Sequence, residues 1–363
     1  MGVVPWSADW QRKRLRLHSA WYRPMQEKAE VPFPTTEEYS DVLGMPPGTR
    51  PFRAGEPTLE AVRDGIVEQG KHYLHRDVGQ YAAVYRFVKP DGKALALRCL
   101  LQAPPPDVEF RCAQQQAYLK KHPLPYFVEA GYYENAVQVA NEWYPLFLMA
   151  WVQGRTLHDY VQRLCKMGQS LPLSQIAAQW EAMLVELRKA GIAHGDLHPL
   201  NALVGDDGKI ILVDYDTLFV PALRSLPAPL SGCEGYVHPS YLSGTPRPFN
   251  EAIDTFGGAV VLLSLRALAD DPTLFDRFSQ DNLLFTGEDL SLPDRSKLFD
   301  LLEHHRLPQI AGLASALREE CRQPTETGHL TLNILTSNRP RHGLVPDLVP
   351  EKRVYQKRGS SGL

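Results

Sequence analysis

Three polar side chains stand at a fixed spacing in the middle of the chain and could support phosphoryl transfer. Asp196 follows His194 and Gly195, Asn201 comes five residues after Asp196, and Asp214 follows a short apolar run. Transfer of a phosphoryl group from ATP needs a carboxylate that orients the acceptor hydroxyl, and oxygen ligands that hold Mg²⁺ against the phosphates. We therefore predict that Asp196 orients the acceptor and that Asn201 and Asp214 are metal ligands.

The elements around these residues can bring them together. A helix is expected over 175–190, because its apolar residues recur three or four positions apart and Gly191 follows as a C-cap. The apolar segments 202–204 and 210–213 flank the turn sequence Asp206-Asp207-Gly208, which predicts a hairpin. Any single Asp or Asn in this part of the chain could instead be a capping or turn residue, and only their combined order favours catalysis.

The first half of the chain predicts a small sheet with one helix, and the second half is mainly helical. A hairpin is expected because residues 81–88 alternate and turn at Lys89-Pro90-Asp91-Gly92 before the partner strand 94–100. The further expected elements are a helix over 107–121, strands over 137–141 and 146–151, and a buried helix over 254–268.

Composition and charge are typical of a soluble globular chain with a core. Of the 363 residues 44% are hydrophobic and 22% are charged, and the net charge of −3 gives no attraction to nucleic acid or anionic membranes. The five cysteines are scattered without a CxxC pair, which fits a reducing compartment, and the most apolar run, Gly257–Leu265, is about half a membrane span. We therefore expect a cytoplasmic protein that binds neither nucleic acid nor membrane.

The central residues also resemble the catalytic pattern of protein kinases, H-x-D-x-x-x-x-N followed by a D-F-G-type triplet. Here the first part is His194-Gly195-Asp196 with Asn201, and the triplet is Asp214-Tyr215-Asp216. The resemblance implies an α+β, bilobal protein-kinase-like fold, with a small mainly-β N-lobe that carries one helix and a larger mainly-α C-lobe. The implied divisions are an N-terminal extension (1–55), the N-lobe (56–150), the C-lobe (151–320) and a largely disordered C-terminal tail (321–363).

The same resemblance implies ATP and Mg²⁺ as cofactors and suggests where the nucleotide binds. Met149–Gly154 resembles the hinge between the lobes, where adenine would bond to backbone groups of Ala150 and Val152. Asp77–Val84 aligns with the phosphate-covering loop G-x-G-x-x-G-x-V but keeps only its middle glycine. The implied nucleotide contacts are Gly79, Val84, Ala96, Arg98, Ala150 and Val152, and Arg98 is also implied in catalysis.

Several departures from the kinase pattern concern the grip on the phosphates. Arg98 replaces the usual strand lysine, and arginine is bulkier and forked, so the exchange is not neutral. No acidic residue lies between Phe110 and Val128, so the carboxylate that pairs with that lysine is missing, and one of Gln114–Gln116 could take its place. The triplet ends in Asp216 instead of glycine, which stiffens that turn.

Two further acidic residues have alternative interpretations. Glu109 could pair with Arg98 only if its helix begins earlier than expected. Asp254 resembles the aspartate that begins the buried large-lobe helix and braces the catalytic loop through its backbone. Asp254 could instead be a simple N-cap.

The order of several segments is shared with one bacterial group. These segments are Ala96–Cys99, Leu124–Val128, Trp143–Leu146, Met149–Gly154, Ala193–Leu197, Leu212–Asp216 and Gly235–Pro239. The chain resembles, over about residues 75 to 300, the bacterial kinase-like proteins of the tellurite-resistance (TerY-associated) type. That resemblance implies a protein substrate and, as partners, von Willebrand A-type proteins and metal-dependent protein phosphatases.

Three functions fit the sequence. An active serine/threonine protein kinase is favoured because the acceptor-orienting carboxylate and both metal ligands are present. A pseudokinase or scaffold that binds nucleotide is favoured by Arg98 and its missing carboxylate partner. A small-molecule kinase also fits the central segment, which resembles antibiotic and choline kinases, but Ser225–Pro248 and the helix from Asp254 match the protein-kinase pattern better.

Overall fold

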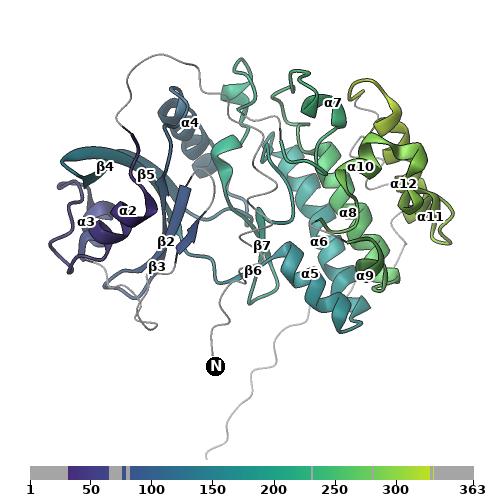
Figure 1. Ribbon diagram of the computed structural model, residues 1–363, viewed down its shortest axis with the longest axis horizontal. Coiled ribbons are helices and arrows are strands. Elements are labelled where there is room, and N and C mark those ends of the chain that lie inside the picture. The colour runs from purple at the N-terminus through teal and green to yellow at the C-terminus, as the bar shows by residue number, and fades with distance from the viewer. Residues whose placement is uncertain are drawn as a thin grey trace, which may run out of the picture.

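The computed structural model describes residues 32–64, 76–78, 82–229, 232–279, 282–327 and 330. These residues form a small antiparallel sheet at one end of the molecule and a larger group of helices at the other (Figure 1). The architecture is therefore mixed α+β, as expected, and the sheet comes from the first half of the chain.

The five-stranded sheet is antiparallel throughout, in the order β1-β2-β3-β5-β4. Its strands are β1 (Arg76–Val78), β2 (Ala82–Val88), β3 (Ala94–Leu100), β4 (Ala130–Val139) and β5 (Glu142–Ala150). The expected hairpin of β2 and β3 is confirmed, and Gly92 in its turn has φ +82°, a conformation that favours glycine. The bounds expected for the next strand, 137–141, are wrong, because β4 begins at Ala130 and Asn141 has a positive φ in the turn to β5.

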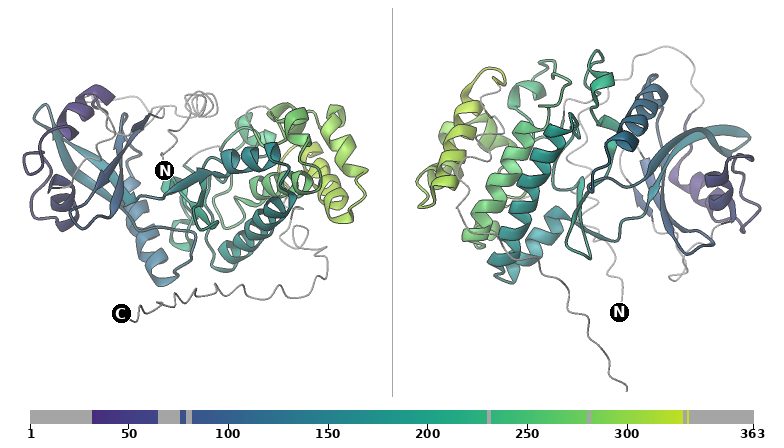
Figure 2. Two further views of the ribbon diagram at one scale, coloured as in Figure 1. Left: turned by 90° about the horizontal axis from the view of Figure 1, so that it is seen from below. Right: turned by 180° about the vertical axis from the view of Figure 1, so that it is seen from behind.

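Helices cover both faces of this sheet. α2 (Thr36–Leu43) and α3 (Pro57–Asp64) lie on the outer side, whereas α4 (Val108–Lys121) lies on the side of the helical region (Figure 1 and Figure 2). Tyr39 of α2 is fully buried in the core under the sheet, and its hydroxyl donates to a backbone carbonyl of β3 at 3.0 Å. Part of the stretch assigned to an N-terminal extension (1–55) is therefore core, and its first 31 residues lie outside the described residues.

Two long helices form the centre of the helical region. α6 (Ser170–Lys189) and α8 (Thr255–Asp270) pack against each other, and the Trp180 indole N–H donates to the Gly258 carbonyl at 3.1 Å. The expectation of a buried helix over 254–268 is confirmed, since nearly every residue of α8 is buried. Among the described residues, none of the helices has both the length and the apolar character needed to cross a bilayer.

A second, three-stranded sheet lies where the two regions meet (Figure 1). It consists of β6 (Gly154–Thr156), β7 (Ala202–Gly205) and β8 (Ile210–Leu212), so the hairpin expected over 202–213 is confirmed. The other described helices of the region are α5 (Leu157–Lys166), α7 (Pro239–Leu242), α9 (Leu274–Phe278), α10 (Gly287–Ser291), α11 (Lys297–Glu303) and α12 (Pro308–Arg322). The 3-10 helices are η1 (Tyr215–Thr217), η2 (Pro221–Leu223) and η3 (Pro293–Arg295).

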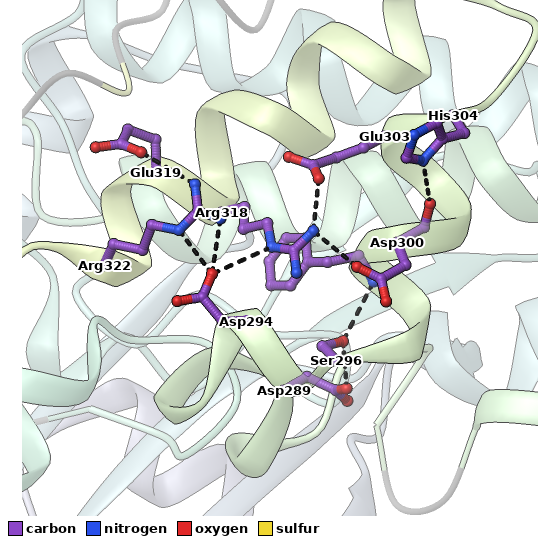
Figure 3. A network of polar contacts seen from close by, with 10 residues as sticks. Asp289, Asp294, Ser296, Asp300, Glu303, His304, Arg318, Glu319 and Arg322 are labelled. Carbon is purple, nitrogen blue, oxygen red and sulfur yellow. Dashed lines mark hydrogen bonds and ion pairs between the residues drawn. The ribbon is translucent and has the colours of Figure 1, made fainter.

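An ion-pair network joins the last helices of the helical region (Figure 3). The guanidinium of Arg318 on α12 contacts Glu303 Oε2 at 2.6 Å and Asp300 Oδ1 at 2.9 Å, both on α11. Arg322, one turn further along α12, lies 2.7 Å from Asp294 Oδ1 of η3. These pairs hold α12 against the elements that precede it.

The described chain continues past the expected domain boundary at residue 320. α12 ends at Arg322, Thr327 Oγ1 donates to Glu320 Oε2 at 2.8 Å, and Leu330 is buried in the core of the helical region. The first residues assigned to the C-terminal tail therefore pack on the helical region. Residues 331–363 lie outside the described residues.

Candidate functional site

Asp196 and Asn201 contact each other within the loop that connects α6 to β7. The Asn201 side-chain amide donates to the Asp196 carbonyl at 3.0 Å and to Asp196 Oδ2 at 3.3 Å. Asn201 is 1% exposed, and its Oδ1 accepts no hydrogen bond from any described residue. A buried amide oxygen without a donor carries a desolvation cost, so it is suited to a cation or donor that the chain itself does not supply.

Asp214 lies next to this pair because the residue before it is bonded to the same loop. The Val213 N–H donates to the Asn201 carbonyl at 2.9 Å, and His194 Nε2 lies 2.8 Å from the Val213 carbonyl oxygen. His194 Nδ1 accepts from the Asp196 N–H at 3.4 Å, so Nε2 is the ring nitrogen that can donate to the Val213 carbonyl. The fold thus brings together the three residues that the sequence singled out.

The backbone at Asp214 has a strained conformation. Its φ of 67° and ψ of 52° lie in the left-handed region, which residues other than glycine adopt rarely and Asp and Asn tolerate best. This turn leads the chain from β8 directly into η1. Such strain persists only where the surrounding contacts impose it, and it is concentrated at functional sites.

The loop is braced by a buried carboxylate at the start of α8. Asp254 accepts hydrogen bonds from the backbone N–H groups of His194 and Gly195, the second at 2.8 Å. Asp254 occupies the N-cap position of α8, but its side chain makes no capping bond there, so the bracing expectation is confirmed and Asp254 is not a simple N-cap. Burial raises the pKa of Asp254, and His194, Arg247 and the two N–H groups offset part of that rise.

Gly195 allows this loop to approach the segment after β8. Its φ is +84°, and a Cβ at this position would lie 2.2 Å from the Thr217 carbonyl oxygen. Thr217 Oγ1 donates to the His194 carbonyl at 2.9 Å, and Arg247 Nη1 donates to the Gly195 carbonyl at 2.6 Å. The backbone of the loop is therefore hydrogen-bonded on both sides, and these bonds determine where Asp196 lies.

Arg98 links the five-stranded sheet to the residues after β8. Its Nη2 lies 3.0 Å from Asp214 Oδ1, and its Nη1 forms an ion pair with Asp216 Oδ2. The guanidinium also lies 5.4 Å from the centre of the Phe147 ring. Burial by itself lowers the pKa of Arg98, but the two carboxylates outweigh burial and hold the pKa above its ordinary value.

The role of Asp216 as an ion-pair partner was missed by the sequence reasoning. We expected this residue only to stiffen a turn. The available signal was an acid at a position where the kinase pattern has glycine, together with the missing carboxylate on the preceding helix. Neither feature alone specifies the contact.

α4 presents no carboxylate to Arg98. The Gln115 side chain donates to the Leu218 carbonyl at 2.9 Å, so it supports the segment after β8. Cys112 is the α4 residue next to the ion pair, and burial raises its thiol pKa to about 12, which keeps it neutral. Glu109 lies in the exposed first turn of α4. The alternative that a glutamine of α4 pairs with Arg98 is wrong, because Arg98 pairs with carboxylates of another segment.

Two of the predicted nucleotide contacts share the sheet face that carries Arg98. Val84 is directly opposite Arg98 in the pairing of β2 with β3, and Ala96 lies two residues from Arg98 along β3. Residues that are directly opposite, or two apart on one strand, point to the same face of a sheet. Because Arg98 reaches Asp214, this face is turned toward the loop residues described above.

The connection from β5 to β6 contains the two residues predicted to bond adenine. The Ala150 N–H donates to the Glu129 carbonyl at 3.0 Å, so at most the carbonyl of Ala150 remains for a base. Val152 follows β5 in this connection and is half-buried. Gly79, the predicted contact in the phosphate-covering loop, lies outside the described residues.

A cavity of about 490 Å³ lies beside the Arg98–Asp216 ion pair. Its walls include Cys112 of α4, Tyr132 of β4 and Phe147 of β5. Apart from Arg98, none of the described residues predicted to contact nucleotide lines it. The cavity borders Asp216, whose side chain remains 37% exposed.

The oxygen atoms of the site fit Mg²⁺. Asn201 offers a buried amide oxygen and Asp214 a carboxylate, and Mg²⁺ is commonly held by one or two such groups together with phosphate and water oxygens. Within the described part of the chain, no group of three or more His, Cys, Asp and Glu side chains could hold a metal ion by itself.

No protein-family model matches the chain, so its function is inferred from this geometry.

Proposed function

We propose that the chain is an ATP- and Mg²⁺-dependent phosphotransferase with a bilobal protein-kinase-like fold, which phosphorylates serine or threonine in a protein. In this proposal the sheet region is the small lobe (56–150) and the helical region is the large lobe (151–320). The observation that carries it is the set of contacts joining Arg98, Asp214, Asn201 and Asp196. These contacts surround Asn201 Oδ1, to which none of the described residues donates a hydrogen bond. A cation, a carboxylate and hard oxygen ligands at one place are what phosphoryl transfer requires.

Each of these residues has a role in the proposed reaction. Asp196 orients the acceptor hydroxyl and takes its proton, and the Asn201 amide fixes the Asp196 carboxylate through Oδ2. Arg98 holds the ATP phosphates with its forked donors. Asn201 Oδ1 and the Asp214 carboxylate would hold Mg²⁺, which would supply positive charge to neutralise the phosphates.

A second candidate function is nucleotide binding without transfer, as in a scaffold protein. The contact between Arg98 and Asp214 favours it, because Asp214 must be released from Arg98 before its carboxylate can bind Mg²⁺. The two candidates share the nucleotide site and differ only in whether phosphate leaves ATP.

The proposed location rests on the scattered cysteines and on the short apolar runs of the sequence, and the proposed partners rest on the sequence resemblance. We propose a cytoplasmic protein that acts on a protein substrate. Its proposed partners are a von Willebrand A-type protein and a metal-dependent protein phosphatase.

Incubation of the purified chain with Mg²⁺ and ATP, followed by intact-mass spectrometry of the chain and of casein as a generic acceptor, tests the proposal. We expect phosphate incorporation, with a rate lower by about 10²-fold or more in Asp196→Ala, since a catalytic base contributes at least that much. Asp276→Asn removes an exposed carboxylate of α9 and should keep the wild-type rate.

Calorimetric titration with ATP and Mg²⁺ separates the two candidates. Binding without phosphate incorporation would support the scaffold function. Absence of both binding and incorporation would exclude both functions.

A further inference from the structure

We propose that Asp216 is a positioning residue that holds Arg98 toward the nucleotide phosphates and thereby leaves Asp214 to Mg²⁺. This inference rests on the proposed phosphotransferase function and adds to it a residue that the kinase pattern does not assign. The reason lies in α4, which offers Arg98 only the neutral thiol of Cys112 where a carboxylate is needed.

The guanidinium of Arg98 is divided between two carboxylates. Nη2 contacts Asp214 at 3.0 Å, and Nη1 pairs with Asp216. The two acids lie on one short segment, on either side of Tyr215. A guanidinium has donors in more than one direction, so it can keep one partner when the other leaves. Asp216 is therefore placed to retain Arg98 when Asp214 binds a metal.

The segment that carries Asp216 is fixed on both sides, as a positioning residue requires. The Tyr215 hydroxyl donates to a carbonyl in the connection between α4 and β4 at 3.1 Å. Thr217 Oγ1 donates to a carbonyl in the loop that carries Asp196 at 2.9 Å, and the Leu218 carbonyl accepts from a side-chain amide of α4 at 2.9 Å. These bonds immobilise the backbone around the Asp216 carboxylate.

Loss of the Asp216 carboxylate should change how Mg²⁺ competes for Asp214. Without the Asp216 carboxylate, Arg98 pairs with Asp214 alone. Mg²⁺ then has to displace the largely buried Arg98 guanidinium before it can bind Asp214. If Asp216 only stabilised the fold, removal of its charge would not change the Mg²⁺ concentration that ATP binding requires. The Mg²⁺ concentration at half-maximal ATP binding is therefore the quantity that reports this role.

Titration of ATP binding against Mg²⁺ concentration, by calorimetry on the full chain, tests the proposal. We expect the Mg²⁺ midpoint to rise about fivefold in Asp216→Asn, as for a partly exposed ion pair, and to stay near the wild-type value in Asp216→Glu. In an Arg98→Gln background the same Asp216→Asn change should shift the midpoint no further. Asp276→Asn is the matched charge control.

The possible failures are distinguishable. An unchanged midpoint in Asp216→Asn, with a lower melting temperature, would mean that Asp216 only stabilises the fold and would overturn the inference. If Asp216→Asn does not fold, Asp216→Ser replaces it, because serine also removes the charge at this position. Its midpoint should also rise, and an unchanged one overturns the inference. Absence of ATP binding in the wild type would instead overturn the phosphotransferase function itself.

Discussion

The two regions that meet at the site hold their functional groups by different kinds of contact. In the helical region, Asp254 binds two backbone N–H groups of the loop that carries Asp196, and Arg247 binds a carbonyl of the same loop. In the sheet region, one long side chain, Arg98, reaches across to two carboxylates. Buried bonds to the backbone determine geometry, whereas the largely buried Arg98 guanidinium is divided between two carboxylates, one of them 37% exposed, and can exchange partners.

One part of the site is therefore held rigidly, and another part can change its partner. The loop with Asp196 is held in place by hydrogen bonds from the chain itself, and catalysis requires preorganisation of this kind. The sheet contributes a cation, Arg98, which in the proposed function changes partner when Mg²⁺ and nucleotide bind. We therefore expect changes on the helical side to lower stability most, and changes on the sheet side to alter ligand dependence more than stability.

Asp254→Ala removes the carboxylate that braces the loop in the helical region and should have the largest effect on stability. It leaves two buried N–H groups and the Arg247 guanidinium without their carboxylate, so we expect a loss of about 3–5 kcal/mol in the free energy of unfolding. Urea denaturation followed by circular dichroism measures this loss. The exposed control Asp276→Asn should stay within about 0.5 kcal/mol of wild type, and a similar value for Asp254→Ala would contradict the bracing role.

Gly195→Ala tests the same loop through sterics instead of charge. A Cβ at Gly195 meets the Thr217 carbonyl oxygen at 2.2 Å, whereas at Gly208, which also has a positive φ, nothing lies within 4 Å. The left-handed backbone alone costs alanine about 1–2 kcal/mol, so Gly208→Ala should lose that amount and Gly195→Ala more. Equal losses in thermal denaturation of the two variants would mean that the loop can move away from Thr217.

Arg98→Gln addresses the sheet side and should cost only about 1–2 kcal/mol of unfolding free energy, because Asp216 is 37% exposed and is solvated when its partner is lost. Its effect on ATP binding should be larger than its effect on stability. Parallel urea melts and ATP titrations measure both. A stability loss as large as that of Asp254→Ala would remove the proposed difference between the two sides.

His238→Gln should have the smallest effect and a distinct pH dependence. The buried His238 ring accepts from the Ser240 N–H at 3.2 Å and lies 3.0 Å from the Glu320 carbonyl, and burial lowers its pKa. The unfolded chain therefore binds a proton more readily than the native one, so wild-type stability falls as the pH drops below about 6.5. The advantage of wild type over His238→Gln, about 1 kcal/mol at pH 8, should shrink toward pH 5.

Denaturation melts between pH 8 and pH 5 provide the measurement for His238. His122→Gln is the matched control, because His122 is exposed and its replacement should leave the pH profile unchanged. A constant difference between wild type and His238→Gln across this range would show that the ring does not resist protonation.

Local pattern predicted much of the fold where one element contacts its neighbour in sequence. The hairpins over 82–100 and 202–212 and the buried helix α8 followed from alternation, turn residues and apolar content. The start of β4 at Ala130 was missed because an irregularity between Tyr133 and Val137 interrupts the strand pairing there. The burial of Tyr39 under the sheet was missed because it depends on contacts with distant segments. Hydrophobic periodicity cannot predict such contacts, because residues far apart in sequence share no periodic signal.

The grouping of Asp196, Asn201 and Asp214 could be predicted from the amino-acid sequence, because only a loop and a tight hairpin separate these residues. The partners of Arg98 could be identified only from the tertiary structure. Its contact with Asp216 spans 118 residues and depends on how the sheet is set against the segment after β8. Side chains of either α4 or that segment could have supplied the carboxylate, and packing of the two regions selected the second.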